Sequence, residues 1–368
     1  MIKGLRIVLV SLSLLLVSTF AVYADNHGNM PETMQSVAET NEEEDGLNVQ
    51  KILFGHILDS YSWEICKVGE KEIALHLPVI LYSKTSGWHI FSSKKLGHGG
   101  GYDGFYPAPA GDPHEGKLME KMEDGSFVRP LDLSLTKTAF AIIINSILLL
   151  LIFLPAAKWF RMHKDGSGVP GKYATFIEFA VMSVEDSVIK PCVGENYKKF
   201  SPYLLTAFFF IFLCNILALI PILPFGVGVT ANVTITMALA LCTFLVVNIF
   251  GTKEYWKEIF WPDVPLMLKA PLPIIPLIEF FGLLTKPIAL MIRLFANMLS
   301  GHMAILVLTI LIFIGFNTSV VMGSSLTLIS VLFNVFMNML ELLVAFIQAY
   351  VFTLLSSIFI GLAQVKHH

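Results

Sequence analysis

The chain has 368 residues, of which 55% are hydrophobic and only 14% are charged. Soluble domains carry about 25% charged residues, so a water-soluble globule of this length could not cover its surface with so few charges. The formal net charge of −3 gives no positive excess of the kind that attracts nucleic acid. The composition therefore predicts a membrane protein and argues against a nucleic-acid partner.

The charges are distributed unevenly along the chain. Residues 25–135 hold 18 acidic residues and 9 Lys or Arg, a balance of −9, whereas residues 136–368 hold 10 and 14, a balance of +4. The first 24 residues carry only Lys3 and Arg6. We therefore expect three parts: a targeting segment at 1–24, an exported acidic segment at 25–135 and a membrane domain at 136–368.

Residues 1–24 have the pattern of a secretory signal peptide. Lys3 and Arg6 provide a positive n-region. An apolar run from Ile7 to Phe20 follows, and Val22-Tyr23-Ala24 places small residues at the −3 and −1 positions of a cleavage site. An uncleaved membrane helix is the alternative, but the run is short and acidic residues follow at once. In either case the next residues are predicted to lie outside the cytoplasm.

The exported segment is predicted to combine a disordered arm with a small β-rich unit. Residues 25–50 are acidic and poor in aromatic residues, which is typical of disorder. From about Ile52, short runs mix β-branched and aromatic residues, which favours strands. The expected strands lie within His56–Cys66, Glu72–Tyr82 and His89–Ser93, and the expected loops contain Gly97–Gly104, Pro107, Pro109 and Pro113.

Histidine and cysteine spacing does not indicate a metal or other cofactor. Six of the ten histidines lie in residues 25–135, namely His27, His56, His76, His89, His98 and His114. Their spacing is wide and irregular, with no HxxxH or CxxC pattern, so scattered surface histidines are the favoured interpretation over a metal site. Cys66 is the only cysteine outside the membrane domain, so no disulfide framework is implied.

The membrane domain opens with one clear span. Thr138–Ala157 are twenty uncharged residues, enough to cross a bilayer once. Lys158, Arg161 and Lys164 follow, and the positive-inside rule places this flank in the cytoplasm. Next, Tyr173–Lys190 has apolar residues at helical spacing among charges, which predicts an amphipathic helix on the cytoplasmic surface.

The next two spans are predicted to form a hairpin. No charged residue occurs between Phe200 and Thr252, and the segment 224–228 (PFGVG) reads as a turn. Lys253 and Lys257 then bring the chain back to the cytoplasm. The two spans are expected at about 203–222 and 229–250.

Two apolar stretches of unusual length end the chain, at about 274–316 and 325–364. Each exceeds the roughly 20 residues of a perpendicular span, so each is either two tightly joined spans or one long, strongly tilted helix. The expected fold class is an all-α polytopic membrane protein with about five membrane-embedded helices, the last two long and strongly tilted, plus the exported β-rich extension.

Only four formally charged residues occur in 270–365: Glu279, Lys286, Arg293 and Glu341. An arginine at mid-bilayer costs about 2.5–3.5 kcal/mol on insertion scales, so Arg293 is functional by default. The alternatives are an internal ion pair and snorkelling to an interface, and the long apolar run after Arg293 argues against snorkelling.

Helical geometry places several of these residues on one stripe. At about 100° per residue, Glu279, Lys286 and Arg293 fall within about 40° of one another, and Asn297 joins them. The positions around Arg293 are small, namely Ala289, Ala296 and Ser300. Small residues let a second helix pack closely, and this stripe offers no obvious acid near Arg293. We therefore expect the partner of Arg293 to come from another chain.

Two groups near this stripe can exchange protons. His302 lies about 180° around the helix from Arg293 and is expected to point away from it. In the last helix one polar or small stripe contains Asn334, Asn338, Glu341, Ala345 and Gln348. His302 and Glu341 are the two groups of this core that can readily exchange a proton near neutral pH, whereas Arg293 stays protonated. A buried structural His302–Glu341 pair is one interpretation; the neutral polar stripe favours a hydrated proton pathway.

The segment 283–301 (LLTKPIALMIRLFANMLSG) resembles the a subunit of F-type ATP synthases. The resemblance covers about 135–368 and rests on Lys286-Pro287, Arg293–Met298, Gly301, Thr230-Ala231-Asn232, Glu341 and Gln348. It implies a non-catalytic, proton-translocating stator subunit of a bacterial inner membrane, with an exported N-terminal part and a cytoplasmic C-terminus. The implied partners are a c-subunit ring, a b-subunit stalk, the remaining ATP synthase subunits and the lipid bilayer.

The resemblance also implies roles for single residues. In that family an arginine faces a rotating ring of c subunits whose membrane-embedded carboxylate carries the ion, so Arg293 would hold this carboxylate and block a direct leak. Two offset half-channels would be lined by Asn297, His302, Glu341 and Gln348, with Glu279, Lys286, Asn232 and Asn338 as supporting polar residues. The segment 25–135 departs from compact family members, and its role is not implied.

Two other function classes fit less well. A secondary transporter that binds an anionic substrate at Arg293 would need internal repeats with paired broken helices, and no convincing repeat is seen. An intramembrane protease would need a nucleophile or metal motif, and neither GxSxG nor HExxH occurs. A GxxxxGK[ST] loop is also absent, so this chain is not expected to hydrolyse ATP itself. The ion is expected to be a proton by default, with sodium left open.

Overall fold

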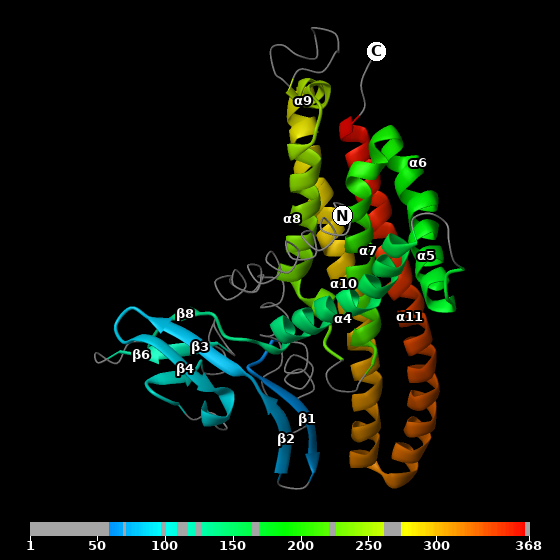
Figure 1. Cartoon of the computed structure of the whole chain (residues 1–368). Coiled ribbons are helices and arrows are strands. Elements are labelled where there is room, and N and C mark those ends of the chain that lie inside the picture. Colours follow the sequence, from blue (N-terminus) through cyan, green and yellow to red (C-terminus); the bar gives the residue numbers. More distant parts are fainter. Residues whose placement is uncertain are drawn as a thin grey trace.

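The computed structural model describes residues 59–68, 71–96, 101–108, 117–122, 127–163, 169–220, 226–260 and 274–364. The predicted signal peptide at 1–24 and the predicted acidic arm at 25–50 lie outside these residues. In the described part a β-rich unit precedes the helices and lies beside them (Figure 1).

The β-rich unit contains three small antiparallel sheets, with strand orders β1-β2, β4-β3-β8 and β5-β6-β7. Their strands are β1 (Ser62–Val68), β2 (Lys71–His76), β3 (Pro78–Ser83), β4 (Gly87–Ser92), β5 (Phe105–Pro107), β6 (Leu118–Lys121), β7 (Phe127–Val128) and β8 (Leu131–Asp132). The predicted β-rich unit is thus present. Its details differ: the run expected at 72–82 is two strands divided at Leu77, and Pro107, expected in a loop, ends β5.

The core of this unit follows from the alternation of β-strand side chains. Val79 and Leu81 of β3 point to one side and are fully buried together with Phe105, and Phe91 and Leu118 pack with them. Because successive side chains of a strand point to opposite faces, the residues between them face outward.

Hydrogen bonds tie the unit to the first helix, α4 (Lys137–Met162). Oδ1 of Asp59 accepts hydrogen bonds from the backbone N–H and the hydroxyl of Thr138, at 3.1 and 2.8 Å. A carboxylate at this position is favourable because helix N-termini carry partial positive charge and unpaired N–H groups. The ring of Trp63 meets that of Phe140 edge-on at 6.0 Å. The β-rich unit is therefore docked on the first turn of α4.

The helical part continues from α4 through several shorter helices into two very long ones. Its elements are α5 (Lys172–Val184), a π-helical turn (Glu185–Ile189), α6 (Lys190–Val193), α7 (Tyr197–Ala218), a 3₁₀ turn (Val229–Ala231), α8 (Val233–Ile249), α9 (Lys253–Phe260), α10 (Ile274–Thr318) and α11 (Val320–Gln364). Among the described residues, four helical segments are long and apolar enough to cross a membrane, or five if the bent α8–α9 pair is one span. The expected all-α polytopic fold is confirmed at this level.

The predicted amphipathic helix at 173–190 is present as α5 and the π-helical turn. Its Ile177, Val184 and Val188 are buried, as their spacing indicated. On the other side Phe176 and Phe179 are exposed, so this helix has apolar residues on both faces. Its place on the cytoplasmic surface stays a prediction.

The predicted hairpin is formed by α7 and α8, with a shorter second helix than expected. The span predicted at 229–250 begins only at Val233, because Val229–Ala231 form a 3₁₀ turn and Asn232 caps α8. After Ile249 the chain bends by 103° into α9. The backbone N–H of Thr252 donates to the carbonyl of Ala363 at 3.0 Å, which holds this bend against α11.

Helices α10 and α11 are each 45 residues long and unbroken. The alternative of two tightly joined spans is therefore wrong for both. At about 1.5 Å per residue each is more than twice as long as a bilayer's hydrocarbon core is thick, so the strong tilt stays the expected arrangement. The two helices lie side by side and turn at Ser319 (Figure 1). Close packing at the turn uses Gly323, where a Cβ would lie 2.6 Å from the ring of Phe316.

The helical part has its apolar side chains outside as well as inside. Leu204 and Ile211 of α7 are fully buried, but Leu151 of α4 and Leu328 and Leu332 of α11 are 64%, 76% and 71% exposed. Several hydroxyl residues are fully buried between helices, namely Thr236, Ser330, Thr353, Ser356 and Ser357. Polar and small residues between helices, with apolar residues outside, are typical of helices that pack within lipid.

Candidate functional site

Among the side-chain contacts between α10 and α11, two together contain all four predicted half-channel residues. Nδ2 of Asn297 donates a hydrogen bond to Oε1 of Gln348 at 2.7 Å. Nδ1 of His302 lies 3.0 Å from Oε1 of Glu341. Residues that are 51 and 39 positions apart in the sequence meet because the two helices run back along each other.

The His302–Glu341 contact is buried and incompletely satisfied. Glu341 is only 4% exposed. Nδ1 of His302 and Oε1 of Glu341 are close enough for an ion pair, but their angles do not fit a hydrogen bond. Neither Oε2 of Glu341 nor Nε2 of His302 has a hydrogen-bond partner among the described residues. Leaving a buried polar group unpaired costs about 1–3 kcal/mol, and more when it is charged. Such groups are stabilised when water or a proton reaches them.

Two glycines make the space for this pair. A Cβ on Gly301 would lie 3.0 Å from both Cδ and Oε1 of Glu341. A Cβ on Gly228, just before the 3₁₀ turn, would lie 2.8 Å from Cδ2 and 2.9 Å from Nε2 of His302. The carboxyl group therefore lies against bare backbone of α10, and the imidazole lies between Glu341 and the turn that precedes α8.

Arg293 lies on an open face of α10. Its side chain is exposed, as are the small residues Ala289, Ala296 and Ser300 around it. Within the described ranges no carboxylate lies at ion-pair distance from its guanidinium, so the alternative of an internal ion pair finds no support there. The neighbouring Leu294 is fully buried, which fixes this helix against the rest of the protein.

The supporting polar residues have mainly local contacts. Glu279 is exposed. The ammonium of Lys286 lies 5.6 Å from the ring centroid of Phe359, and Lys286 lines a small, open pocket between α8, α9, α10 and α11. Oδ1 of Asn232 accepts from the N–H of Thr234 at 2.9 Å and so caps α8. Nδ2 of Asn338 donates to the carbonyl of Asn334 one turn earlier, at 2.8 Å.

One polar residue of this region was not predicted from the sequence. Asn215 of α7 is fully buried; its Oδ1 accepts from the hydroxyl of Thr230 at 2.6 Å, and its Nδ2 donates to the carbonyl of Ala345 at 3.5 Å. Ala345 lies on α11 between Glu341 and Gln348. Asn215 thus links the turn before α8 to the centre of the polar stripe. The available signal was the single asparagine within the predicted apolar span 203–222.

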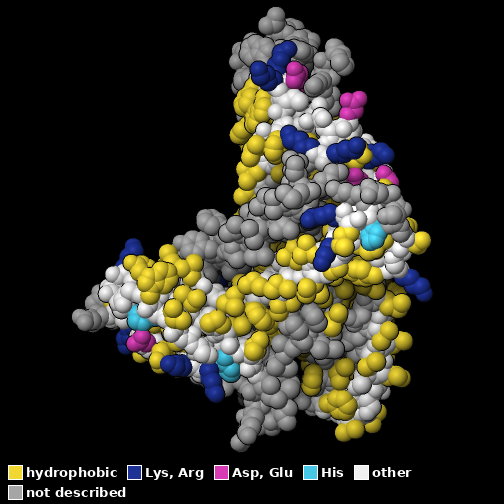
Figure 2. Space-filling model, in the orientation of Figure 1, with side chains coloured by type: hydrophobic (Ala, Val, Ile, Leu, Met, Phe, Trp, Pro, Cys, Tyr) yellow, Lys and Arg dark blue, Asp and Glu magenta, His cyan; other side chains and the backbone are white. Residues whose placement is uncertain are grey.

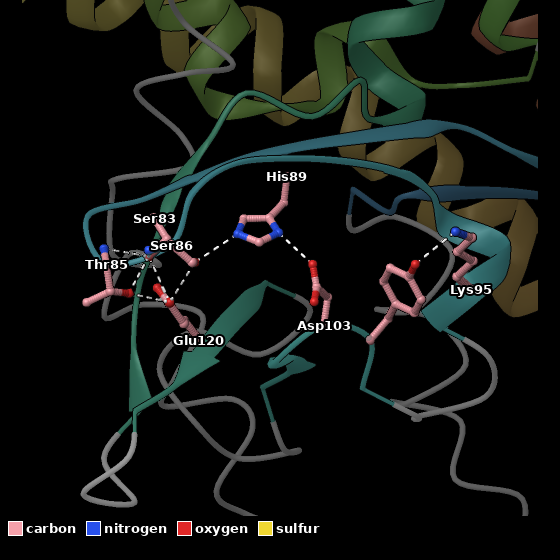
Figure 3. A network of polar contacts seen from close by, with 8 residues as sticks. Ser83, Thr85, Ser86, His89, Lys95, Asp103 and Glu120 are labelled. Atoms are coloured by element: carbon pink, nitrogen blue, oxygen red, sulfur yellow. Dashed lines mark hydrogen bonds and ion pairs between the residues drawn. The ribbon is translucent and has the colours of Figure 1, made fainter.

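A second histidine–carboxylate contact lies in the β-rich unit (Figure 3). Nδ1 of His89 lies 2.6 Å from Oδ2 of Asp103, and Nε2 lies 2.8 Å from the hydroxyl of Ser86. This order of groups is that of a serine nucleophile triad. However, the backbone N–H groups of Thr85 and Ser86 already donate to the hydroxyl of Ser83, so they do not form an oxyanion hole. The cluster holds a turn rather than forming a nucleophile site.

The same turn is held by Glu120 of β6. Its Oε1 accepts hydrogen bonds from the hydroxyls of Ser83 and Thr85, at 2.7 and 2.8 Å (Figure 3). Because every one of these hydroxyls has a partner, the network fixes the β3–β4 hairpin on the β5-β6-β7 sheet.

Comparison with known proteins identifies the helical part. Residues 139–361 match the family model described as ATP synthase A chain. ATP synthase subunit a of Pelodictyon phaeoclathratiforme is 37% identical over 272 residues, which cover 71% of this chain and 73% of that protein. The chain belongs to the ATP synthase subunit a family. Subunit a of Chloroherpeton thalassium is 39% identical, over 67% of this chain and 70% of that protein. Subunit a of Anaeromyxobacter dehalogenans is 40% identical, over 69% of this chain and 64% of that protein.

Membership of the subunit a family makes this chain a non-catalytic, multi-pass membrane subunit that acts in proton transport, with catalysis in other subunits. The secondary-transporter alternative is not favoured by these relatives. Residues 52–133 match a separate family model, described as Domain of unknown function (DUF8433). The β-rich unit therefore receives no role from the comparison.

Proposed function

We propose that this chain is the proton-translocating stator subunit of a rotary F-type ATP synthase and that its open Arg293 face lies against the c-subunit ring. The observation that carries the proposal is an exposed arginine on a face of small residues, within a long apolar helix. A cation on such a face is costly in lipid, so it needs an anionic partner from another chain. The c-ring carboxylate supplies that charge, and a b-subunit stalk and the other subunits complete the assembly.

Arg293 acts here as a gate. Each passing ring carboxylate loses its proton, pairs with the guanidinium and is released again as the ring turns. A permanent positive charge repels a proton that would otherwise cross directly beside the ring. Arginine suits this task better than lysine because it does not deprotonate and can make several hydrogen bonds as its partner moves.

The half-channels are lined by the four residues of these two contacts between α10 and α11. The unpaired Nε2 of His302 and Oε2 of Glu341 are positions where water can bind and pass a proton. Asn297 and Gln348 continue the polar lining toward Arg293. One proton that crosses 100 mV releases about 2.3 kcal/mol, so several must cross per ATP and any leak would waste the gradient.

The proposal includes a topology. Residues 1–24 are a signal peptide, 25–135 lie in the periplasm, and 136–368 lie in the bacterial inner membrane with a cytoplasmic C-terminus. The support is the basic flank after α4 and the acidic balance before it. Alkaline phosphatase fused after residue 135 should be active, and the same enzyme fused after residue 368 should be inactive. The opposite pattern would reverse the topology.

The gate is tested with inverted membrane vesicles that contain the assembled enzyme. Arg293→Ala and Arg293→Lys should both abolish ATP-driven acidification, followed with a fluorescent pH-gradient dye. Arg161→Ala, which removes an exposed arginine near the end of α4, is the matched control and should pump normally. Robust pumping by either Arg293 variant would overturn the proposed function.

A further inference from the structure

The β4-β3-β8 sheet has an outer face of large apolar side chains that the fold of the unit does not use. Ile80 of β3 pairs with Ile90 of β4, and Tyr82 pairs with Trp88. The rings of Tyr82 and Trp88 lie 5.0 Å apart. Trp88 is 61% exposed and Ile90 is 72% exposed. The opposite face of these strands supplies the core of the unit. Among the described residues, the outward side chains are therefore exposed and can contact a partner outside the unit.

The outer face extends to the start of α4. The pairing of β3 with β8 places Leu81 opposite Asp132, and the N–H of Leu133 donates to the carbonyl of Ile80 at 2.9 Å. Leu133 is thus opposite Ile80, on the same side of the sheet, and is 44% exposed. We define the outer face as Ile80, Tyr82, Trp88, Ile90 and Leu133.

No flexible linker separates this face from the membrane helix. The N–H of Leu135 donates to the carbonyl of Pro78 at 3.2 Å, so pairing with β3 continues to two residues before α4. The N–H of Lys137 donates to the carbonyl of Ser60 at 3.0 Å, and Asp59 binds Thr138 as described above. The orientation of the sheet relative to α4 is therefore held by several hydrogen bonds.

The outer face is continuous with the lipid-facing side of α4. Ile147, Leu151 and Leu154 of α4 are about half exposed or more, as expected for side chains that contact lipid. Figure 2 shows hydrophobic side chains of the β-rich unit and of α4 forming one nearly unbroken surface. Exposed apolar patches of this kind mark membrane or protein contacts, and tryptophan and tyrosine are enriched where protein meets the lipid headgroup region.

We propose that the outer face of the β4-β3-β8 sheet binds the lipid headgroup region of the leaflet in which α4 begins. Trp88 and Tyr82 lie at the headgroups, with Ile90 and Leu133 toward the acyl chains. The β-rich unit thereby supports the first turn of α4 from the membrane surface. This inference does not rest on the proposed proton pathway, because none of its residues lies on α10 or α11.

Site-specific photocrosslinking tests the occupant of the face. Benzoylphenylalanine replaces Ile90 in the full chain, assembled with its partner subunits in native membranes, and the irradiated product is analysed by mass spectrometry. The expected product is a phospholipid adduct. An adduct to another subunit, or to a second copy of this chain, would overturn the proposal.

Two matched positions calibrate the result. The probe at Ile147 on the exposed side of α4 should also give a phospholipid adduct. The probe at Lys84, on the exposed turn between the same two strands, should give at least fivefold less. Lipid adducts at Ile147 without any at Ile90, or equal lipid adducts at Ile90 and Lys84, would contradict a face-specific lipid contact.

A second measurement avoids the probe. The assembled enzyme is reconstituted in phosphatidylcholine vesicles with brominated acyl chains, which quench nearby tryptophans. The chain has five tryptophans, so the emission of Trp88 is obtained as the difference between the fluorescence of the unchanged enzyme and that of the Trp88→Phe variant. We expect this difference signal to be at least halved by the brominated lipid. An unquenched Trp88 signal would overturn the proposal whatever the crosslinking yields.

Discussion

Two histidine–carboxylate contacts in this protein differ in how completely they are satisfied. In the β-rich unit, His89 has Asp103 on one ring nitrogen and Ser86 on the other. Between α10 and α11, His302 lies 3.0 Å from Glu341, but its Nε2 and the Oε2 of Glu341 have no hydrogen-bond partner among the described residues. A saturated contact stabilises a fold, whereas a buried, unsaturated one suits groups that exchange protons with water.

The largest expected difference follows from removing each carboxylate. Glu341→Gln should lower ATP-driven proton pumping at least tenfold, because an amide does not exchange a proton near neutral pH. Asp103→Asn should leave pumping within about twofold of the unchanged chain, since His89 keeps a hydrogen-bonding neighbour. Both variants are measured in the same inverted vesicles, with assembly checked by co-purification. Equal losses in the two variants would remove the distinction between the contacts.

A smaller loss is expected when the space around the buried contact is filled. Gly301→Ala and Gly228→Ala would each place a methyl group 3.0 Å or less from Glu341 or His302, and overpacking of this kind typically costs about 1–3 kcal/mol. We expect proton pumping to fall several-fold in each. Gly282→Ala on α10 is the control, because a Cβ there meets nothing within 4 Å. A Gly282→Ala enzyme as impaired as the other two would show a general effect on the helix.

The second α10–α11 contact allows a double-mutant test. Asn297→Leu leaves the buried amide of Gln348 without its partner, at a cost of about 1–3 kcal/mol. Gln348→Leu leaves the exposed Asn297 without its partner and should cost less. We expect each variant to lower pumping several-fold. If the 2.7 Å hydrogen bond matters, the double variant should lose less than the product of the two single losses. Strictly multiplicative losses would indicate two independent roles.

The smallest effect is expected at the junction between the two regions. Asp59→Ala removes two hydrogen bonds to Thr138 and should speed hydrogen exchange in the first turn of α4 by about tenfold, which corresponds to about 1.4 kcal/mol. Pumping should remain, since neither residue lies near α10. Asp186→Ala, an exposed acid on another helix, should leave this exchange rate unchanged. Unchanged exchange in Asp59→Ala would show that the docking rests on other contacts.

Much of the candidate site could be predicted from residue type and helical spacing. The scarcity of charge in 270–365 singled out Arg293 and Glu341, and the 100° rotation per residue separated Arg293 from His302. Arg293 is indeed exposed on a small-residue face, while His302 contacts Gly228 and Glu341. Spacing within one helix did not predict Asn215, because its partners Thr230 and Ala345 come from other segments.

The sequence by itself determined that this is a membrane protein, where most of its apolar helices run, and which charged side chains are too costly in lipid to be incidental. These properties depend on composition and on local periodicity, which the chain order alone records. Only the tertiary structure decided that α10 and α11 are single helices and that His302 meets Glu341 and Asn297 meets Gln348. It also decided that His89 has a partner on both ring nitrogens, whereas the buried His302–Glu341 contact stays unsatisfied among the described residues. Contacts between residues far apart in sequence depend on how helices pack, and a periodic pattern does not specify that packing.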